Sequence, residues 1–276
     1  MRCLAFLSVL LLVSLSAPVA SAGLLLSYQS GVAAAVGQSG AADPTSQGWS
    51  INSPGTAPNY SFGQDSGQGG WRITDGTARD NYFYQRGLTS SQVSQLVNQD
   101  WEANWTVGVN ADAVGRPGVG TVDNYYSADS SRQNNNALWI EVANEYLYVL
   151  RYENDSAGNV FLNDGTNRFQ ITTGGNALSQ DVGSQAPSTS FIDYQLRYDS
   201  QSGLAFLTDS LGGDHGVVSR SGSGSSNRVV WGAISSAGQG STTWNQLAIN
   251  TVPEPGSAMI FAIASAGGLL LRRRRN

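Results

Sequence analysis

The chain has 276 residues, with 20 acidic residues, 15 basic residues that are all arginine, and one histidine. Residues 23–252 hold ten of the arginines against 19 of the acids, a net charge of −9, which disfavours binding to nucleic acid or anionic surfaces. The single cysteine, Cys3, and the single histidine, His215, exclude a disulfide framework and a Cys/His zinc site.

The first 22 residues predict a secretory signal peptide. Arg2 precedes the apolar run 4–15, Pro18 breaks that run, and the small residues Ala20 and Ala22 form a cleavage site. The short run and the cleavage site make a lasting N-terminal membrane anchor the weaker alternative. We therefore expect the protein to leave the cytoplasm.

Residues 23–252 predict one domain, long enough to bury a core of its own. Its first ~45 residues are loop-rich, although 23–31 fits a first strand and 53–70 a loop. Short alternating or aromatic segments then predict strands. These segments are 71–77, 78–88, 105–114, 137–153, 158–175, 191–210 and 227–250, with turns near Ala143-Asn144 and Ser202-Gly203.

One short helix is expected within 89–104. Thr89 or Ser90 provides a cap, and Val93, Leu96 and Val97 share one face. Each predicted strand has a single apolar side, so two sheets must cover each other. The fold class is therefore all-β, and the architecture a sandwich.

The C-terminal tail, residues 253–276, has three parts in order. Pro253, Glu254 and Pro255 keep the backbone extended. An uncharged segment, 258–271, follows and is short for a membrane span, which needs roughly 20 apolar residues. The chain then carries four arginines, Arg272, Arg273, Arg274 and Arg275, which favour the cytoplasmic side of a membrane.

Together these parts resemble the PEP-CTERM sorting signal. The resemblance implies a Gram-negative bacterium that makes extracellular polysaccharide. It also implies a membrane-embedded exosortase that recognises Pro253, Glu254 and Pro255, processes the tail and releases the protein to the cell surface or extracellular matrix. A plain hydrophobic tail anchor, with a transmembrane helix, is the alternative.

The body resembles a concanavalin A-like, or laminin G-like, jelly roll over residues 71–250. The most telling segment is "VVWGAISSAGQGSTTWNQLAI", in which a strand ending Gly-x-x-Ser-Ser leads through a Gly-rich turn to Trp-Asn and a closing strand. Its residues are Gly232, Ser235, Ser236, Gly238, Gly240, Trp244 and Asn245.

Glu141 and Glu145 are the candidate catalytic residues. Jelly-roll glycanases of the laminarinase type carry Glu-x-Asp-x-Glu on one strand; here the outer positions match, but Ala143 replaces the aspartate. On one regular strand the two residues start roughly 13 Å apart, whereas retaining hydrolysis needs carboxyl groups about 5 Å apart. The favoured interpretation places both glutamates in solvent beside a hairpin turn.

Three further kinds of site were considered. His215 could pair with Asp214 or a distant acid as a base, but a lone histidine in a Gly-rich loop is usually exposed. No cofactor is expected, with a structural Ca²⁺ held by loop aspartates as the alternative. Aromatic rings could stack on sugars. The aspartates are Asp75, Asp112, Asp123, Asp129, Asp155, Asp164, Asp209 and Asp214, and the rings are Trp49, Tyr60, Trp71, Tyr125 and Tyr126.

The sequence thus predicts an exported, non-catalytic protein at the cell surface or in the matrix that interacts with extracellular polysaccharide. One alternative is a glycan hydrolase that uses Glu141 and Glu145. The other is a purely structural coat protein without a specific ligand. The sequence names no ligand-binding residue.

Overall fold

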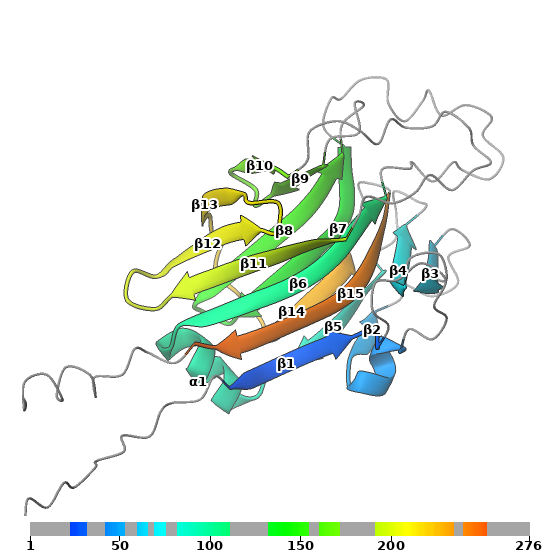
Figure 1. Ribbon diagram of the computed structural model, residues 1–276. Coiled ribbons are helices and arrows are strands. Elements are labelled where there is room, and N and C mark those ends of the chain that lie inside the picture. Colours follow the sequence, from blue (N-terminus) through cyan, green and yellow to red (C-terminus); the bar gives the residue numbers. More distant parts are fainter. Residues whose placement is uncertain are drawn as a thin grey trace, which may run out of the picture. The chain divides into compact units, whose positions relative to one another are not determined.

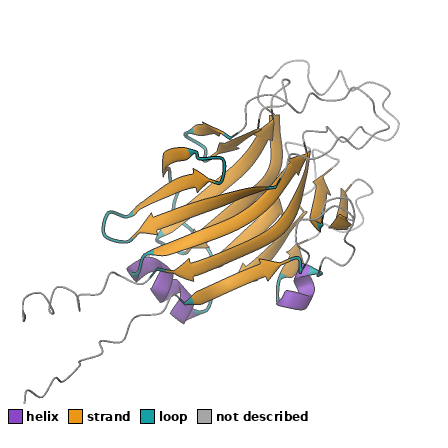
Figure 2. Cartoon of the chain, in the orientation of Figure 1, coloured by secondary structure: helices purple, strands orange, loops and turns teal. Residues whose placement is uncertain are grey.

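The computed structural model describes residues 23–31, 42–52, 60–65, 69–75, 82–110, 132–154, 160–171, 191–234 and 240–252. They belong to one compact unit, Gly23–Val252, in which two β-sheets pack face to face (Figures 1 and 2). The predicted signal peptide and sorting tail lie outside the described residues. No helix within the described ranges is long and apolar enough to cross a membrane.

Within the described residues, the first sheet has eight strands. In space they run β13-β12-β11-β6-β15-β4-β3, and β1 also pairs with β15. The strands are β1 (Leu24–Gln29), β3 (Tyr60–Asp65), β4 (Gly70–Asp75), β6 (Trp101–Asn110), β11 (Ile192–Asp199), β12 (Leu204–Asp209), β13 (Asp214–Val218) and β15 (Gly240–Thr251).

The second sheet has seven described strands, in the order β10-β9-β8-β7-β14-β5-β2. They are β2 (Ser50–Asn52), β5 (Tyr82–Gly87), β7 (Arg132–Val142), β8 (Tyr146–Asn154), β9 (Val160–Asn163), β10 (Arg168–Gln170) and β14 (Arg228–Ala233). All the strand pairs in both sheets are antiparallel. The predicted all-β jelly-roll sandwich is confirmed.

Two expected loops contain strands instead. β3 lies inside the predicted loop 53–70, and β13 holds His215, which was expected in a Gly-rich loop. Both strands lie at ends of the first sheet. Because an edge strand has a partner on one side only, its apolar alternation is weak and glycine is tolerated. Gly63 in β3 and Gly216 in β13 indeed have φ angles of 152° and 79°.

Strand β15 lies inside the first sheet and has two partners on one of its sides. Its first half pairs with β4 and its second half with β1, and the register shifts between Trp244 and Gln246. Asn245 lies at this bulge. Its backbone carbonyl accepts from Ser30 N at 2.8 Å, and its side-chain Nδ2 donates to Gly69 O at 3.0 Å. The Trp-Asn pair of the closing segment therefore marks the point at which β15 changes partner.

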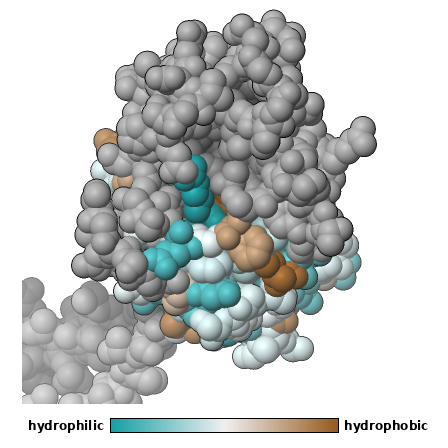
Figure 3. Space-filling model, turned by 90° about the vertical axis from the view of Figure 1, so that its right-hand side faces the viewer, coloured by the Kyte–Doolittle hydropathy of each residue, from teal (hydrophilic) through white to brown (hydrophobic). Residues whose placement is uncertain are grey.

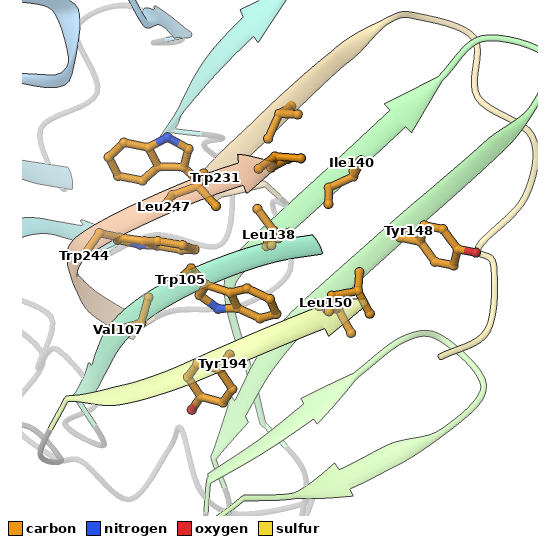
Figure 4. Close-up of a cluster of buried hydrophobic side chains, with 14 of the residues drawn as sticks. Trp105, Val107, Leu138, Ile140, Tyr148, Leu150, Tyr194, Trp231, Trp244 and Leu247 are labelled. Carbon is orange, nitrogen blue, oxygen red and sulfur yellow. The ribbon is translucent and has the colours of Figure 1, made fainter. Parts of the chain in front are cut away.

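Large aromatic and aliphatic side chains from both sheets fill the space between them (Figure 4). Hydrogen bonds between described residues of the two sheets cross this core. Trp71 and Trp105 of the first sheet donate to Tyr84 and Tyr152 of the second at 2.9 and 2.8 Å, and Thr242 donates to Asn136 at 2.7 Å. Burial raises the pKa of Tyr84 to about 12, so its phenol stays neutral at physiological pH. Its oxygen accepts the hydrogen bond from Trp71 Nε1.

The predicted helix is α1 (Ser90–Asn98), with Thr89 as its N-cap. Thr89 Oγ1 accepts from Gln92 N at 3.3 Å, and Thr89 N donates to the Gln92 side chain at 2.9 Å. This capping box fixes the start of the helix. Leu96 is fully buried, and Tyr146 donates to its carbonyl at 3.2 Å. A 3₁₀ helix, η1 (Pro44–Gln47), is the other short helical element described.

Candidate functional site

The hairpin between β7 and β8 separates the two candidate catalytic glutamates. Glu141 pairs with Leu147 on the opposite strand, whereas Glu145 lies in the turn itself. Asn144 has a φ of 62°, and Glu145 N donates to Val142 O at 3.1 Å. The predicted turn is confirmed. Glu145 is exposed as expected, but the expectation of an exposed Glu141 is wrong, because Glu141 is only 2% exposed.

Glu141 is held by the segment that leads into β14. Its Oε1 accepts from Ser225 N at 2.7 Å, Ser225 Oγ at 3.1 Å and Ser226 N at 3.0 Å. Its Oε2 accepts from Arg228 Nε at 2.9 Å. Burial alone would raise the pKa of Glu141, but these hydrogen bonds outweigh it and hold the pKa below its usual value. Glu141 is thus an ionised carboxylate with both oxygens engaged by the protein.

Gly224 allows this loop to approach the hairpin. A Cβ at this position would lie 2.3 Å from Val142 O, closer than any side chain tolerates, so only glycine fits there. Asn144 N donates to Gly224 O at 2.9 Å, which ties the turn to the loop. The surroundings of Glu141 are therefore those of a buried structural anchor, and Glu145 does not take part in them.

His215 has a partner that the sequence did not identify. Its Nε2 lies 2.7 Å from Asp209 Oδ2, and its ring packs against Phe169 at 6.0 Å between centroids. Asp209 Oδ1 also accepts from Leu211 N and Gly213 N. The expectation of an exposed histidine is wrong. The pair joins the two ends of the β12–β13 turn, and the ring of His215 reaches Phe169 of β10 in the other sheet.

The aspartates proposed for Ca²⁺ lie partly inside the described ranges. Asp164 accepts from Thr166 N, Asn167 N, Asn167 Nδ2 and Ser219 N at 2.6–3.0 Å. Asp209 is engaged as above. Across the residues that the structure describes, no group of three or more His, Cys, Asp or Glu side chains could hold a metal. Four candidates fall outside those residues: Asp112, Asp123, Asp129 and Asp155.

Two of the aromatic rings proposed to stack on sugars belong to the core. Trp49 and Trp71 are 2% and 7% exposed, so neither can stack on a sugar, and both have the core role that is commoner for aromatic rings in a sandwich. Tyr125, Tyr126 and the side chain of Tyr60 lie outside the described part of the structure. An exposed ring lies instead on Phe62, stacked on Tyr82 at 4.7 Å. Figure 3 shows the side of the body near β2–β4, where hydrophobic and hydrophilic residues are mixed.

The solvent side of the first sheet carries two hydrogen-bonded groups, which we call the polar face. In one, Gln195 Nε2 donates to Glu102 Oε2 and Asn104 Oδ1, each at 3.1 Å, and Asn104 Nδ2 donates to Glu102 Oε1 at 3.0 Å. In the other, Gln246 Nε2 donates to Thr106 Oγ1 at 2.9 Å, and Thr106 donates to Asp193 Oδ1. The polar face comprises Glu102, Asn104, Thr106, Asp193, Gln195 and Gln246.

The strand registers bring these six side chains together. Gln195 of β11 lies opposite Asn104 of β6, and Thr106 lies between Asp193 of β11 and Gln246 of β15. The hydrogen bonds within the described residues leave Gln195 Oε1, Gln246 Oε1 and Asp193 Oδ2 available as acceptors. Asp193 and Gln246 are exposed, while Glu102, Asn104 and Gln195 are half-buried. The polar face therefore presents fixed oxygen acceptors to solvent.

Sequence reasoning did not find the polar face. Asp193, Gln195 and Arg197 alternate with buried residues and so signalled a solvent side for β11. Their partners on β6 and β15, however, are about 50 to 90 residues away in the chain. No local pattern predicts which distant strands will become neighbours, so a network built across three of them has no signal in the sequence.

The comparisons with known proteins identify the tail. Residues 251–275 match the PEP-CTERM protein-sorting motif. The motif implies export, membrane anchoring before processing and recognition by an exosortase. No curated protein matches the chain significantly.

Several solved structures share the sandwich architecture at low identity. A carbohydrate esterase from Shiga toxin-encoding bacteriophage phi24B is 10% identical with a TM-score of 0.49, covering 84% of this chain and 99% of that one. A botulinum neurotoxin type C structure, described with two ganglioside molecules, is 8% identical with a TM-score of 0.43, covering 88% of this chain and 51% of that one. A sialidase is 11% identical with a TM-score of 0.42, covering 82% of this chain and 19% of that one. Likenesses this distant carry no information on ligand or activity.

Proposed function

We propose that this is an exported, non-catalytic protein of the cell surface or extracellular matrix that interacts with extracellular polysaccharide through the polar face. The observation that carries the proposal is the network of Gln195, Asn104 and Glu102, with its companion around Thr106. Carboxamide and carboxylate groups that are already fixed by one another can bond sugar hydroxyls with little loss of side-chain entropy.

The sorting motif supports the same assignment. A protein that an exosortase processes at Pro253, Glu254 and Pro255 ends outside the cytoplasm. Extracellular polysaccharide is then the abundant ligand at its destination. The negative charge of the body repels anionic membranes. The two alternatives keep their own predictions. A hydrolase using Glu141 and Glu145 releases reducing ends from β-glucans, and a coat protein binds no glycan at all.

Co-sedimentation of the purified protein with polysaccharide from its own host tests the proposal. We expect saturable binding without release of reducing ends. Retention of the protein on cells that lack exopolysaccharide, at the level seen on normal cells, would favour the coat protein and overturn the proposal. Release of reducing ends that is lost in both Glu141→Gln and Glu145→Gln, the second an exposed change that should leave stability unchanged, would establish the hydrolase instead.

A further inference from the structure

The strand registers arrange the solvent side of the first sheet in straight rows that cross the strands. One such row passes through six strands, β13, β12, β11, β6, β15 and β1. Its members are Val217, Phe206, Arg197, Glu102, Asn250 and Leu24. Neighbouring strands are about 4.8 Å apart, so this row extends for about 24 Å.

The row has apolar side chains at both ends and polar side chains in the middle. Phe206 and Val217, 37% and 41% exposed, form one end, and Leu24, 63% exposed, forms the other. Arg197, Glu102 and Asn250 lie between them. A sugar ring has an apolar C–H face and a rim of hydroxyls, so a row with apolar ends and a polar centre matches several sugar units in succession.

The length and openness of the row favour the interior of a polymer over its end. Sites that recognise one small molecule or a chain end are concave and enclose most of the ligand. Here the side chains stand on the outer surface of a sheet and repeat from strand to strand. A single sugar would contact only one or two strands, whereas a chain crossing the sheet contacts all six.

The charges of the face favour a neutral polymer. Glu102 and Asp193 are carboxylates, and Arg197 is the one cation in the row and the polar face together. Anionic polymers are repelled by this balance and by the net charge of the body. The same negative charge attracts a cationic polymer at long range, but the face also offers Gln195 Oε1 and Gln246 Oε1 as neutral acceptors, which sugar hydroxyls can use without forming an ion pair.

We propose that the face binds the interior of a neutral polysaccharide chain that runs across the strands from Phe206 to Leu24. Phe206 stacks on a sugar ring at one end, and Gln195, one row away, bonds hydroxyls at the centre. This inference rests on the proposed function and specifies its ligand class and the direction of the chain.

The test measures affinity of the full chain for soluble β-glucan, dextran and galactomannan, for alginate as the anionic polymer and for chitosan as the cationic one. We expect a neutral polymer to bind best, with affinity rising about tenfold or more from its disaccharide to the polymer. Phe206→Ala and Gln195→Ala should each weaken binding about tenfold. Leu211→Ala and Gln201→Ala, which alter exposed residues in the adjoining turns, should leave it unchanged.

Melting temperatures of all four variants check that folding is intact. Equal affinity for disaccharide and polymer, or preference for alginate or chitosan, would overturn this inference while leaving the proposed function standing. Unchanged binding by both Phe206→Ala and Gln195→Ala would overturn this inference and would also remove the polar face as the binding surface of the proposed function. Absence of binding to every polymer and to the host's own polysaccharide would remove the proposed function as well.

Discussion

At the scale of single residues, Glu141 shows how a catalytic-looking carboxylate serves the fold. Its charge is compensated by Arg228 and by the hydrogen bonds of Ser225 and Ser226. Glu141→Gln should lower the free energy of unfolding by about 3 kcal/mol, because it removes one partner of a buried ion pair. Urea denaturation measures this, and Glu145→Gln, at an exposed position, should change stability by less than about 0.5 kcal/mol.

The effect of Glu141→Gln should also depend on pH. The pKa of Glu141 is lower in the folded protein than its ordinary value of 4.5. Its stabilising contribution is therefore complete above that value and is lost as the pH falls through the lower, folded pKa. The stability difference between wild type and Glu141→Gln should be largest near neutral pH and shrink below about pH 4.5. A difference that stays constant down to pH 3 would contradict the assigned charge state.

Glu141 also marks what a sequence can and cannot say about a residue. The sequence located the turn at Ala143-Asn144 and identified the two glutamates beside it. It gave no sign that Glu141 is buried, because its partners at Ser225 and Arg228 lie 84 and 87 residues away. Phe169, which packs against the ring of His215 from the other sheet, also lies far from it in the chain, so the sequence gave no sign of that contact either.

At the scale of elements, helix α1 was predictable down to its cap. Thr89→Ala removes the acceptor for Gln92 N and should cost about 1 kcal/mol. Thr89→Ser keeps the hydroxyl and should retain most of that stability. Thermal or urea unfolding of the two variants separates loss of the cap from loss of the side-chain methyl. Equal destabilisation by both would show that the capping box contributes nothing.

The side chain and carbonyl of Asp164 join the edges of the two sheets. This residue follows β9 in the second sheet and accepts from Ser219 N, just after β13 in the first, at 2.7 Å. Ser221 Oγ donates to Asp164 O at 3.1 Å. Asp164→Ala leaves several amide donors without an acceptor and should cost about 3 kcal/mol. Hydrogen exchange should then accelerate most in β9, β10 and β13, and uniform acceleration across both sheets would contradict a local role.

Sequence patterns located the central strands more reliably than the edge strands. Central strands such as β11, whose apolar residues alternate without a break, were located from sequence. The edge strands β3 and β13 were assigned to loops, because each contains a glycine at positive φ and lies at an end of the sheet. The jelly-roll arrangement itself came from resemblance, since alternation fixes which side of a strand faces the core but not which strand lies beside it.

At the scale of the whole molecule, the ends of the described body meet. Gly23 N donates to Thr251 Oγ1 at 3.0 Å, Thr251 N donates to Gly23 O at 3.0 Å, and Val252 N donates to Asp100 O at 2.8 Å. The last of these hydrogen bonds therefore precedes Pro253 directly. Folding and sorting should be separable if residues up to Val252 stabilise the body and the exosortase recognises the residues that follow.

Replacing Pro253, Glu254 and Pro255 together by alanine tests that separation. We expect the melting temperature and circular dichroism to match wild type, because the hydrogen bonds that join the two ends of the body are made by Gly23, Asp100, Thr251 and Val252, which the variant keeps. The intact mass of the exported protein should instead correspond to an unprocessed C-terminus, and the protein should remain in the membrane fraction. Glu145→Gln, an exposed change within the body, should be processed normally. A variant that lacks all three motif residues yet reaches the surface with the wild-type mass would show that the motif does not direct processing in this protein.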